Sequence, residues 1–143
     1  IGRRLKEANP NCISYPLEPL NSPTLSTGYK VGNHRIQGIS DEFIPPILKL
    51  DECGEVVSVD DIDSIIMAQR ISREFGIGVG ISSGANLLGA IIANERLGEN
   101  AVVTTVFADD NKKYLSTDYC SEITPAEDSM SKDIELISVN AIK

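Results

Sequence analysis

The sequence predicts an α/β fold with a mainly parallel sheet, because two strand candidates alternate with two helix candidates. Residues 55–59 (EVVSV) are rich in β-branched side chains, which favour strands. Residues 101–107 (AVVTTVF) have the length and apolar character of a buried strand. Helices are expected over residues 60–75 and 82–97. Such alternation is typical of parallel sheets, which place ligands at the carboxyl ends of their strands.

The first third of the chain is predicted to hold a helix, a strand and a long loop. Residues 1–9 carry apolar side chains at helical spacing and are followed by a proline, which ends the pattern. Residues 12–17 (CISYPL) are expected to form a short strand. Residues 18–46 contain four prolines and three glycines. Long loops of this kind are usually functional. A short helix is expected over residues 44–50, which overlap the end of this loop.

The two central helices have clear boundary signals. Asp60 and Asp61 can cap the first helix, whose isoleucines form a broad apolar stripe. Gly98 is expected to end the second helix. The glycine-rich residues 76–81 between them are expected to be extended, either as a short strand or as an approach to the second helix. Residues 114–119 are expected to form a short helical turn.

The end of the chain differs from the rest. Residues 124–133 are polar, and residues 135–142 (ELISVNAI) are compatible with an added edge strand or with a tail. The predicted organisation is therefore one α/β domain over residues 1–123 and a tail over residues 124–143.

Composition and charge exclude several classes of protein. The chain has 143 residues, of which 41% are hydrophobic and 24% charged, as is usual for one soluble domain. No apolar run approaches the roughly 18 residues that a membrane-spanning helix needs. The formal net charge of −8 argues against a nucleic-acid partner and against an anionic membrane surface.

Metal-ligating residues are sparse. Cys12, Cys53 and Cys120 are far apart, and His34 is the single histidine, so we expect neither a zinc site nor a disulfide framework. Reduced thiols fit a cytoplasmic protein. The chain begins with Ile1 and shows no signal peptide, so we expect it to be a piece of a longer protein.

Residues 80–85 (GISSGA) are the most informative candidate site. Two hydroxyls, Ser82 and Ser83, stand at a predicted helix start beside glycines, which let a ligand approach the backbone closely. In one interpretation a serine is simply the N-cap residue. In the other, one serine caps the helix and its neighbour faces a ligand. The glycines of residues 76–84 do not form a dinucleotide fingerprint, because a helix rather than a strand precedes them.

Other polar residues are expected to be structural. Asp109 and Asp110 are compatible with a carboxylate pair for acid–base work, but Asp-Asp-Asn after a strand is more typical of a turn. His34 has no nucleophile near it in sequence and is expected to be a loop residue. Residues 35–39 are expected to form a surface loop that turns at Gly38.

Five segments, in this order, resemble the cysteine synthase (O-acetylserine sulfhydrylase) family, which belongs with cystathionine β-synthase to the fold-type II pyridoxal-phosphate enzymes. They are GRRLKE at residues 2–7, YPLEPLNSPTL at 15–25, HRIQGISDEFIP at 34–45, VGISSGA at 79–85 and YLST at 114–117. The resemblance covers roughly residues 1–120.

The resemblance implies that the chain is the carboxy-terminal part of such an enzyme, with a three-layer α/β sandwich and pyridoxal 5'-phosphate as cofactor. It implies that the parent protein replaces the acetate of O-acetylserine with sulfide to give cysteine. Two alternatives stay open. The replacement could be of the cystathionine β-synthase type, or the chain could be a non-catalytic fragment that only pairs with a partner chain.

Carried over residue by residue, the resemblance implies three cofactor-binding residues. Ser82 matches the serine that hydrogen-bonds the pyridine nitrogen, Gly38 matches a glycine that lines the pocket with its backbone, and Ser83 matches the capping neighbour of Ser82. A neutral hydroxyl does not force protonation of the ring, so the ring is a weaker electron sink, suited to eliminating a good leaving group. The positive end of the helix acts in the same sense.

None of the lysines in this chain lies in a motif that matches the Schiff-base lysine of the family. The resemblance therefore implies that the fragment holds no catalytic residue and is inactive alone. It also implies an amino-acid substrate, a homodimer and, as a further partner, the tail of serine acetyltransferase. Ser40 and Ala108 stand where the family usually has glycine and proline, which leaves the choice of substrate open.

Overall fold

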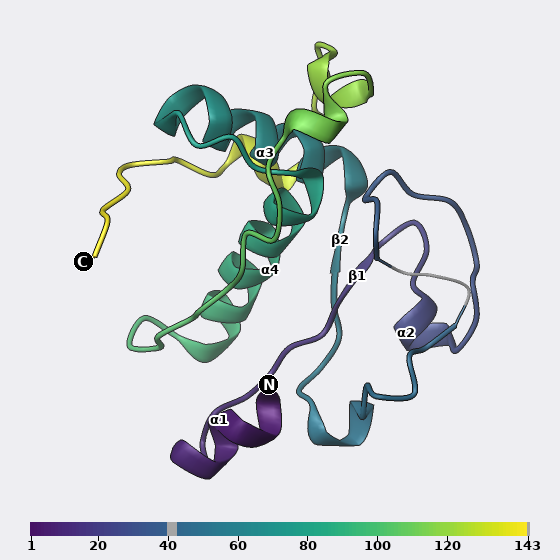
Figure 1. Ribbon diagram of the computed structural model, residues 1–143, viewed down its shortest axis with the longest axis vertical. Coiled ribbons are helices and arrows are strands. Elements are labelled where there is room, and N and C mark those ends of the chain that lie inside the picture. The colour runs from purple at the N-terminus through teal and green to yellow at the C-terminus, as the bar shows by residue number, and fades with distance from the viewer. Residues whose placement is uncertain (40–42, 143) are drawn as a thin grey trace.

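Figure 1 shows a computed structural model of the chain, which describes residues 1–39 and 43–142. The fold is α/β with a parallel sheet, as the sequence predicts. Strands β1 (Leu17–Pro19) and β2 (Val57–Val59) pair in parallel. Two long helices, α3 (Asp61–Phe75) and α4 (Ile81–Leu97), pack against each other beside the sheet, and α4 contacts β2.

The remaining elements are short. They are the helices α1 (Gly2–Ala8) and α2 (Thr24–Thr27) and the 3-10 turns η1 (Leu50–Glu52), η2 (Lys112–Tyr114), η3 (Asp118–Cys120) and η4 (Met130–Lys132). The sequence predicts a helical turn over residues 114–119, and the turns η2 and η3 lie at the two ends of that range. No helix among the described residues is long and apolar enough to cross a membrane.

Helix α3 forms where the sequence predicts it and has a cap at each end. The Asp60 carboxylate accepts hydrogen bonds from the backbone N–H groups of Ile62, at 2.8 Å, and Asp63, at 3.1 Å. Gly76 ends the helix with φ +70°, in the left-handed region that glycine adopts without strain. The inner face buries Ile65, Met67, Ala68 and Ile71, which belong to the main core.

Helices α3 and α4 approach closely because α4 lacks a side chain at the contact. A Cβ atom on Gly84 would overlap the carbonyl oxygen of Ser64 and would lie 2.8 Å from the backbone nitrogen of Ala68. At the other end of α4, the N–H of Gly98 donates to the carbonyl of Asn94 at 2.8 Å, so Gly98 is the C-cap that the sequence predicts.

The strands differ in extent from the prediction. β1 begins at Leu17, which is only the last residue of the predicted strand over residues 12–17. Before it, the Ser14 carbonyl accepts from the N–H of Gly54, but Pro16 has no N–H with which to continue a ladder. β2 occupies the last three residues of its predicted range, 55–59. After Gly76, residues 77–80 belong to no strand, and Gly80 at their end is extended.

The helix predicted over residues 44–50 does not form. The prolines at positions 45 and 46 cannot donate backbone hydrogen bonds, and the chain turns with the N–H of Leu48 on the carbonyl of Pro45, at 2.9 Å. Ile47 is 91% exposed whereas Ile44 and Leu48 are half-buried, so the three side chains do not form one buried helical face.

Residues 101–107 are the largest departure from the prediction, because they form no strand. They run as an extended segment along α4, held where the Asn86 side-chain amide donates to the carbonyl of Val106 at 2.8 Å (Figure 1). Val102 is 94% exposed. A strand satisfies its backbone by pairing, and no described segment pairs with this one. Residues 135–142 likewise lie in no described strand, and all of them are exposed except Leu136, which is half-buried against the core.

The segment after residue 123 is fastened to α3. The buried Asp63 carboxylate accepts from the Ser129 hydroxyl and from the N–H groups of Met130, at 3.0 Å, and Ser131, at 3.4 Å. Arg70 donates to the carbonyls of Ser131 and Ile134. The division into a domain over residues 1–123 and a tail stays a prediction, but the first part of that tail packs on the domain.

Candidate functional site

The predicted cofactor serines lie in the first turn of α4, but neither of them caps it. The helix begins at Ile81, and its N-cap is Gly80, with no side-chain cap bond. The expectation that Ser82 or Ser83 is the N-cap residue was therefore wrong. The physical reason lies at position 80, where a Cβ atom would overlap the Asp109 carboxylate, so only glycine fits there.

Both serine hydroxyls are thus left without a structural task. Ser83 is buried, and its Oγ has no hydrogen-bond partner among the described residues. Ser82 is half-buried and likewise makes no side-chain hydrogen bond within the described part of the chain. No side chain caps the first turn of α4 by a hydrogen bond, although the Asp109 carboxylate lies beside Gly80 at this positive helix end. A free neutral donor beside a positive helix end fits an unprotonated pyridine nitrogen, which is the part of the cofactor that Ser82 is predicted to bind.

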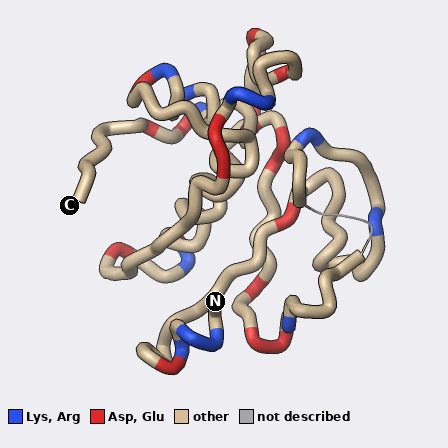
Figure 2. Tube along the Cα trace, in the orientation of Figure 1, with Lys and Arg blue, Asp and Glu red and all other residues tan. Residues whose placement is uncertain are grey.

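The turn after residues 101–107 forms one wall of this first turn of α4. The N–H of Gly80 donates to the Asp109 carbonyl at 3.0 Å. The Asp109 carboxylate accepts from the Tyr114 hydroxyl at 2.9 Å and pairs with the Lys113 ammonium at 2.5 Å. Asp110 accepts from the N–H of Lys112 at 2.9 Å. The turn interpretation of Asp109 and Asp110 is therefore confirmed, and Figure 2 shows its acidic and basic stretches adjacent along the trace.

The ionisation of this wall is fixed by burial and by Asp109. Burial, and then the hydrogen bond to Asp109, raise the pKa of Tyr114 above its ordinary value. The hydrogen bond to Asp109 also raises the pKa of Lys113. Near neutral pH the phenol therefore stays protonated as a donor, and the ammonium stays charged. The wall presents fixed hydrogen bonds rather than a titrating pair.

Gly38 lies in a second region, the loop over residues 34–39. It is exposed with φ +87°, and no described atom lies within 4 Å of where its Cβ would be, so the predicted turn at Gly38 is confirmed. Two residues earlier, Ile36 is fully buried in the core. His34 accepts from the N–H of Ile36 through Nδ1 at 3.2 Å, which is the loop role that the sequence predicts. No described contact joins Gly38 directly to Ser82.

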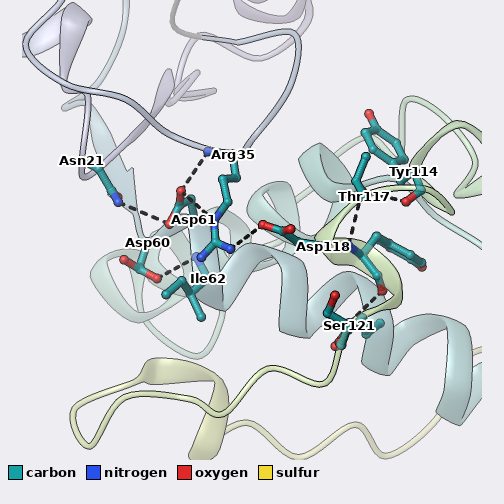
Figure 3. Close-up of polar contacts among 11 residues, drawn as sticks. Asn21, Arg35, Asp60, Asp61, Ile62, Tyr114, Thr117, Asp118 and Ser121 are labelled. Atoms are coloured by element: carbon teal, nitrogen blue, oxygen red, sulfur yellow. Dashed lines mark hydrogen bonds and ion pairs between the residues drawn. The ribbon is translucent and has the colours of Figure 1, made fainter.

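A polar network that sequence reasoning missed connects the two regions. Asp61 accepts from the backbone N–H of Arg35 at 2.8 Å and from the Asn21 side-chain amide at 3.2 Å. The Arg35 guanidinium lies between Asp61, at 3.6 Å, and Asp118, at 2.6 Å (Figure 3). The hydrogen bond to Asp118 is the main cause of the raised pKa of Arg35.

This network was missed because Asp61 was interpreted as a helix cap. Asp60 alone performs that task, and the Asp61 side chain, 5% exposed, turns to the loops instead. A signal was present in the sequence. A second acidic residue directly after a parallel strand stands at the carboxyl edge of the sheet, where loops gather.

Two cavities flank the short elements, and Ser82, Ser83 and Gly38 line neither. One, of about 1000 Å³, lies between α1 and residues 47–53. The other, of about 400 Å³, lies between residues 12–17 and residues 102–105 and is also lined by small residues of α4. Among the described residues, no group of three or more His, Cys, Asp or Glu could hold a metal ion.

Comparison with known proteins gives a family. A family model described as "Pyridoxal-phosphate dependent enzyme" matches residues 1–109. The chain is 43% identical over 122 residues to a probable cysteine synthase of Bacillus subtilis, covering 85% of this chain and 39% of that protein. It is 40% identical over 118 residues to cysteine synthase B of Campylobacter jejuni, covering 82% and 38%. The chain thus spans about two fifths of the length of these curated relatives.

Solved structures agree with the fold. A hydrogen sulfide-producing enzyme from Fusobacterium nucleatum superposes with a TM-score of 0.92 at 58% identity, covering 98% of this chain and 42% of that one. A cysteine synthase from Entamoeba histolytica gives a TM-score of 0.80 at 29% identity, covering 92% and 39%.

Proposed function

Because the chain belongs to the family of pyridoxal-phosphate dependent enzymes, we propose that it is part of a cysteine synthase-like enzyme, which replaces the acetate of O-acetylserine with sulfide. The observation that carries the proposal is the first turn of α4. There two serine hydroxyls have no partner within the described chain, beside a helix end that no side chain caps. The cysteine synthases among the relatives support the choice of substrate.

In this proposal each residue has a limited task. When bound, pyridoxal phosphate supplies the electron sink for elimination and replacement at the β-carbon of an amino acid. Ser82 donates a hydrogen bond to the pyridine nitrogen and, being neutral, leaves that nitrogen unprotonated. The positive end of α4 acts in the same direction. Gly38 offers its backbone to the pocket, and Ser83 is the neighbour of Ser82 in the first turn, with a buried hydroxyl that has no partner among the described residues.

A second candidate function is the release of hydrogen sulfide. It is favoured by the 58% identity to the Fusobacterium enzyme, which exceeds the 43% identity to the Bacillus cysteine synthase. Another structure of the Fusobacterium enzyme, a D232N mutant, is described as a complex with an α-aminoacrylate intermediate. The addition of sulfide to give cysteine and the release of sulfide from cysteine can share such an intermediate. The two candidates therefore differ in which direction of the reaction the rest of the site favours.

Substrate turnover is expected to need more polypeptide than this chain. No lysine here lies in a matching motif, and the 400 Å³ cavity between two extended segments leaves their facing edges without a partner among the described residues. We propose that the chain alone is inactive. A dimeric assembly, and binding of the serine acetyltransferase tail, are further expectations that the family resemblance carries.

The test uses the complete protein and a matched pair of serine variants. Ser82→Ala is expected to lower the affinity for pyridoxal phosphate or the turnover of O-acetylserine with sulfide, whereas Ser138→Ala, in the exposed tail, changes neither. Unchanged spectra and kinetics in Ser82→Ala would remove its assigned role. Rates with O-acetylserine plus sulfide, compared with sulfide release from cysteine, decide between the two candidates.

The chain alone provides the complementary experiment. Incubation with pyridoxal phosphate, borohydride reduction and peptide mapping are expected to give no lysine that is labelled specifically. A stable visible absorption band that maps to one lysine would contradict the inactivity of the chain.

A further inference from the structure

We propose that Arg35 is a positioning residue for the candidate site, because it fixes the loop that carries Gly38 and ties that loop to the turn beside Ser82. The inference rests on the proposed function for its ligand and on the contacts of Arg35 for its mechanism.

The first step is the anchoring of the loop. The Arg35 backbone N–H is held by the Asp61 carboxylate at 2.8 Å, and the next side chain, Ile36, is fully buried. Asp61 is itself fixed at the start of α3 and also accepts from Asn21, in the turn after β1. Two consecutive residues are therefore immobilised just before Gly38, where the positive φ redirects the chain. The placement of Gly38 follows from that anchor.

The second step is the link from Arg35 to the first turn of α4. The guanidinium donates to Asp118, in η3, at 2.6 Å. Thr117, which caps η3, donates to the carbonyl of Tyr114 at 2.6 Å. The Tyr114 hydroxyl donates to Asp109, whose carbonyl accepts from Gly80. These hydrogen bonds, linked through the covalent chain between Thr117 and Asp118, join the loop of Gly38 to the N-cap of the helix that bears Ser82.

The chemistry of the side chain suits this role. A guanidinium is planar, always charged, and presents several donors in a fixed fork, so it can engage two carboxylates from different segments at once. A lysine ammonium is a point charge and reaches them less well. Figure 3 shows Arg35 between Asp61 and Asp118, which come from α3 and η3.

The experiment compares Arg35→Ala with Arg96→Ala in the complete protein. Arg96 is a matched control, because its side chain is 40% exposed against 41% for Arg35 and it also pairs with a carboxylate, Glu55. Arg35→Ala is expected to weaken pyridoxal-phosphate binding about tenfold and to speed amide hydrogen exchange in residues 34–39, as expected for the loss of a charge-assisted bond. Arg96→Ala should change both by less than about twofold, as is usual for an exposed ion pair.

Two further variants test the mechanism. Arg35→Lys should recover part of the affinity, and Asp118→Asn should weaken it without adding to the effect of Arg35→Ala. The inference is overturned if Arg35→Ala and Arg96→Ala behave alike, or if Arg35→Ala and Asp118→Asn are additive. If the wild-type protein binds no pyridoxal phosphate, the proposed function fails. Hydrogen exchange in residues 34–39 then still decides the role of Arg35.

Discussion

Helices α3 and α4 and the extended residues 101–107 all carry many apolar side chains, but these end in opposite environments. The helices bury one another around Gly84, and their backbone hydrogen bonds lie within each helix. Residues 101–107 expose Val102 and Val106, and no described segment pairs with them. The difference shows that an apolar run becomes a strand only beside a partner, whereas a helix satisfies its own backbone.

The largest expected effect lies at the crossing of the two helices. Gly84→Val would place its branched side chain on the Ser64 carbonyl and force the helices apart. We expect the free energy of unfolding to fall by about 3 kcal/mol or more, as overpacking of a tight core does. Urea unfolding followed by far-ultraviolet circular dichroism measures it.

The control for that variant is Ala90→Val, in the same helix. Ala90 borders the 400 Å³ cavity, so the added methyl groups have room, and we expect a loss below about 1 kcal/mol from helix propensity. Equal losses at the two positions would show that the close approach at Gly84 does not limit stability.

The second prediction compares the free energy of unfolding lost when one side chain is truncated in α4 and one in residues 101–107. Leu88→Ala, at a side chain that is 1% exposed, is expected to cost about 3 kcal/mol. Val102→Ala, at 94% exposure, is expected to cost less than about 0.5 kcal/mol. Chemical denaturation of both variants is the measurement. A cost above about 1.5 kcal/mol at Val102 would mean that residues 101–107 are packed in solution.

The same contrast explains what the sequence could and could not predict. The start of α3 and the end of α4 follow from local signals, Asp60 and Gly98, and these were confirmed. The start of α4 was misplaced because Gly80 is dictated by Asp109, which lies 29 residues later in the chain. The strand over residues 101–107 was wrong because pairing depends on other segments, which local pattern does not report.

The candidate site divides in the same way. The serines and the turn at Gly38 were identified from short motifs, and the turn at Asp109 and Asp110 from its composition. The Arg35 network joins positions 21, 35, 61 and 118, and no local spacing reveals it. Contacts between distant segments are what the sequence alone does not specify.

The third prediction extends the helical region to the tail. Asp63→Asn removes the charge that three donors of residues 129–131 share, and we expect a loss of about 2 kcal/mol with faster protease cleavage between residues 121 and 134. Asp133→Asn, at an exposed position, is the control and should leave both unchanged. If Asp63→Asn is cleaved no faster than wild type, the tail is held by its apolar contacts instead.

The smallest effect is a dependence on pH at Tyr114, where the segment after residues 101–107 meets α4. Burial and Asp109 raise the pKa of Tyr114 in the folded protein. The folded state therefore holds this proton more tightly than the unfolded state does. The stabilisation is complete below the unfolded-state pKa of about 10 and is lost as the pH rises above it.

Tyr114→Phe should cost about 1 kcal/mol between pH 7 and 9. The difference from wild type should then shrink above about pH 10, because the wild type alone loses stability through this phenol. Thermal unfolding of both proteins from pH 7 to 11 measures the difference. Parallel curves across that range would show that the Tyr114 hydroxyl ionises as readily in the fold as outside it.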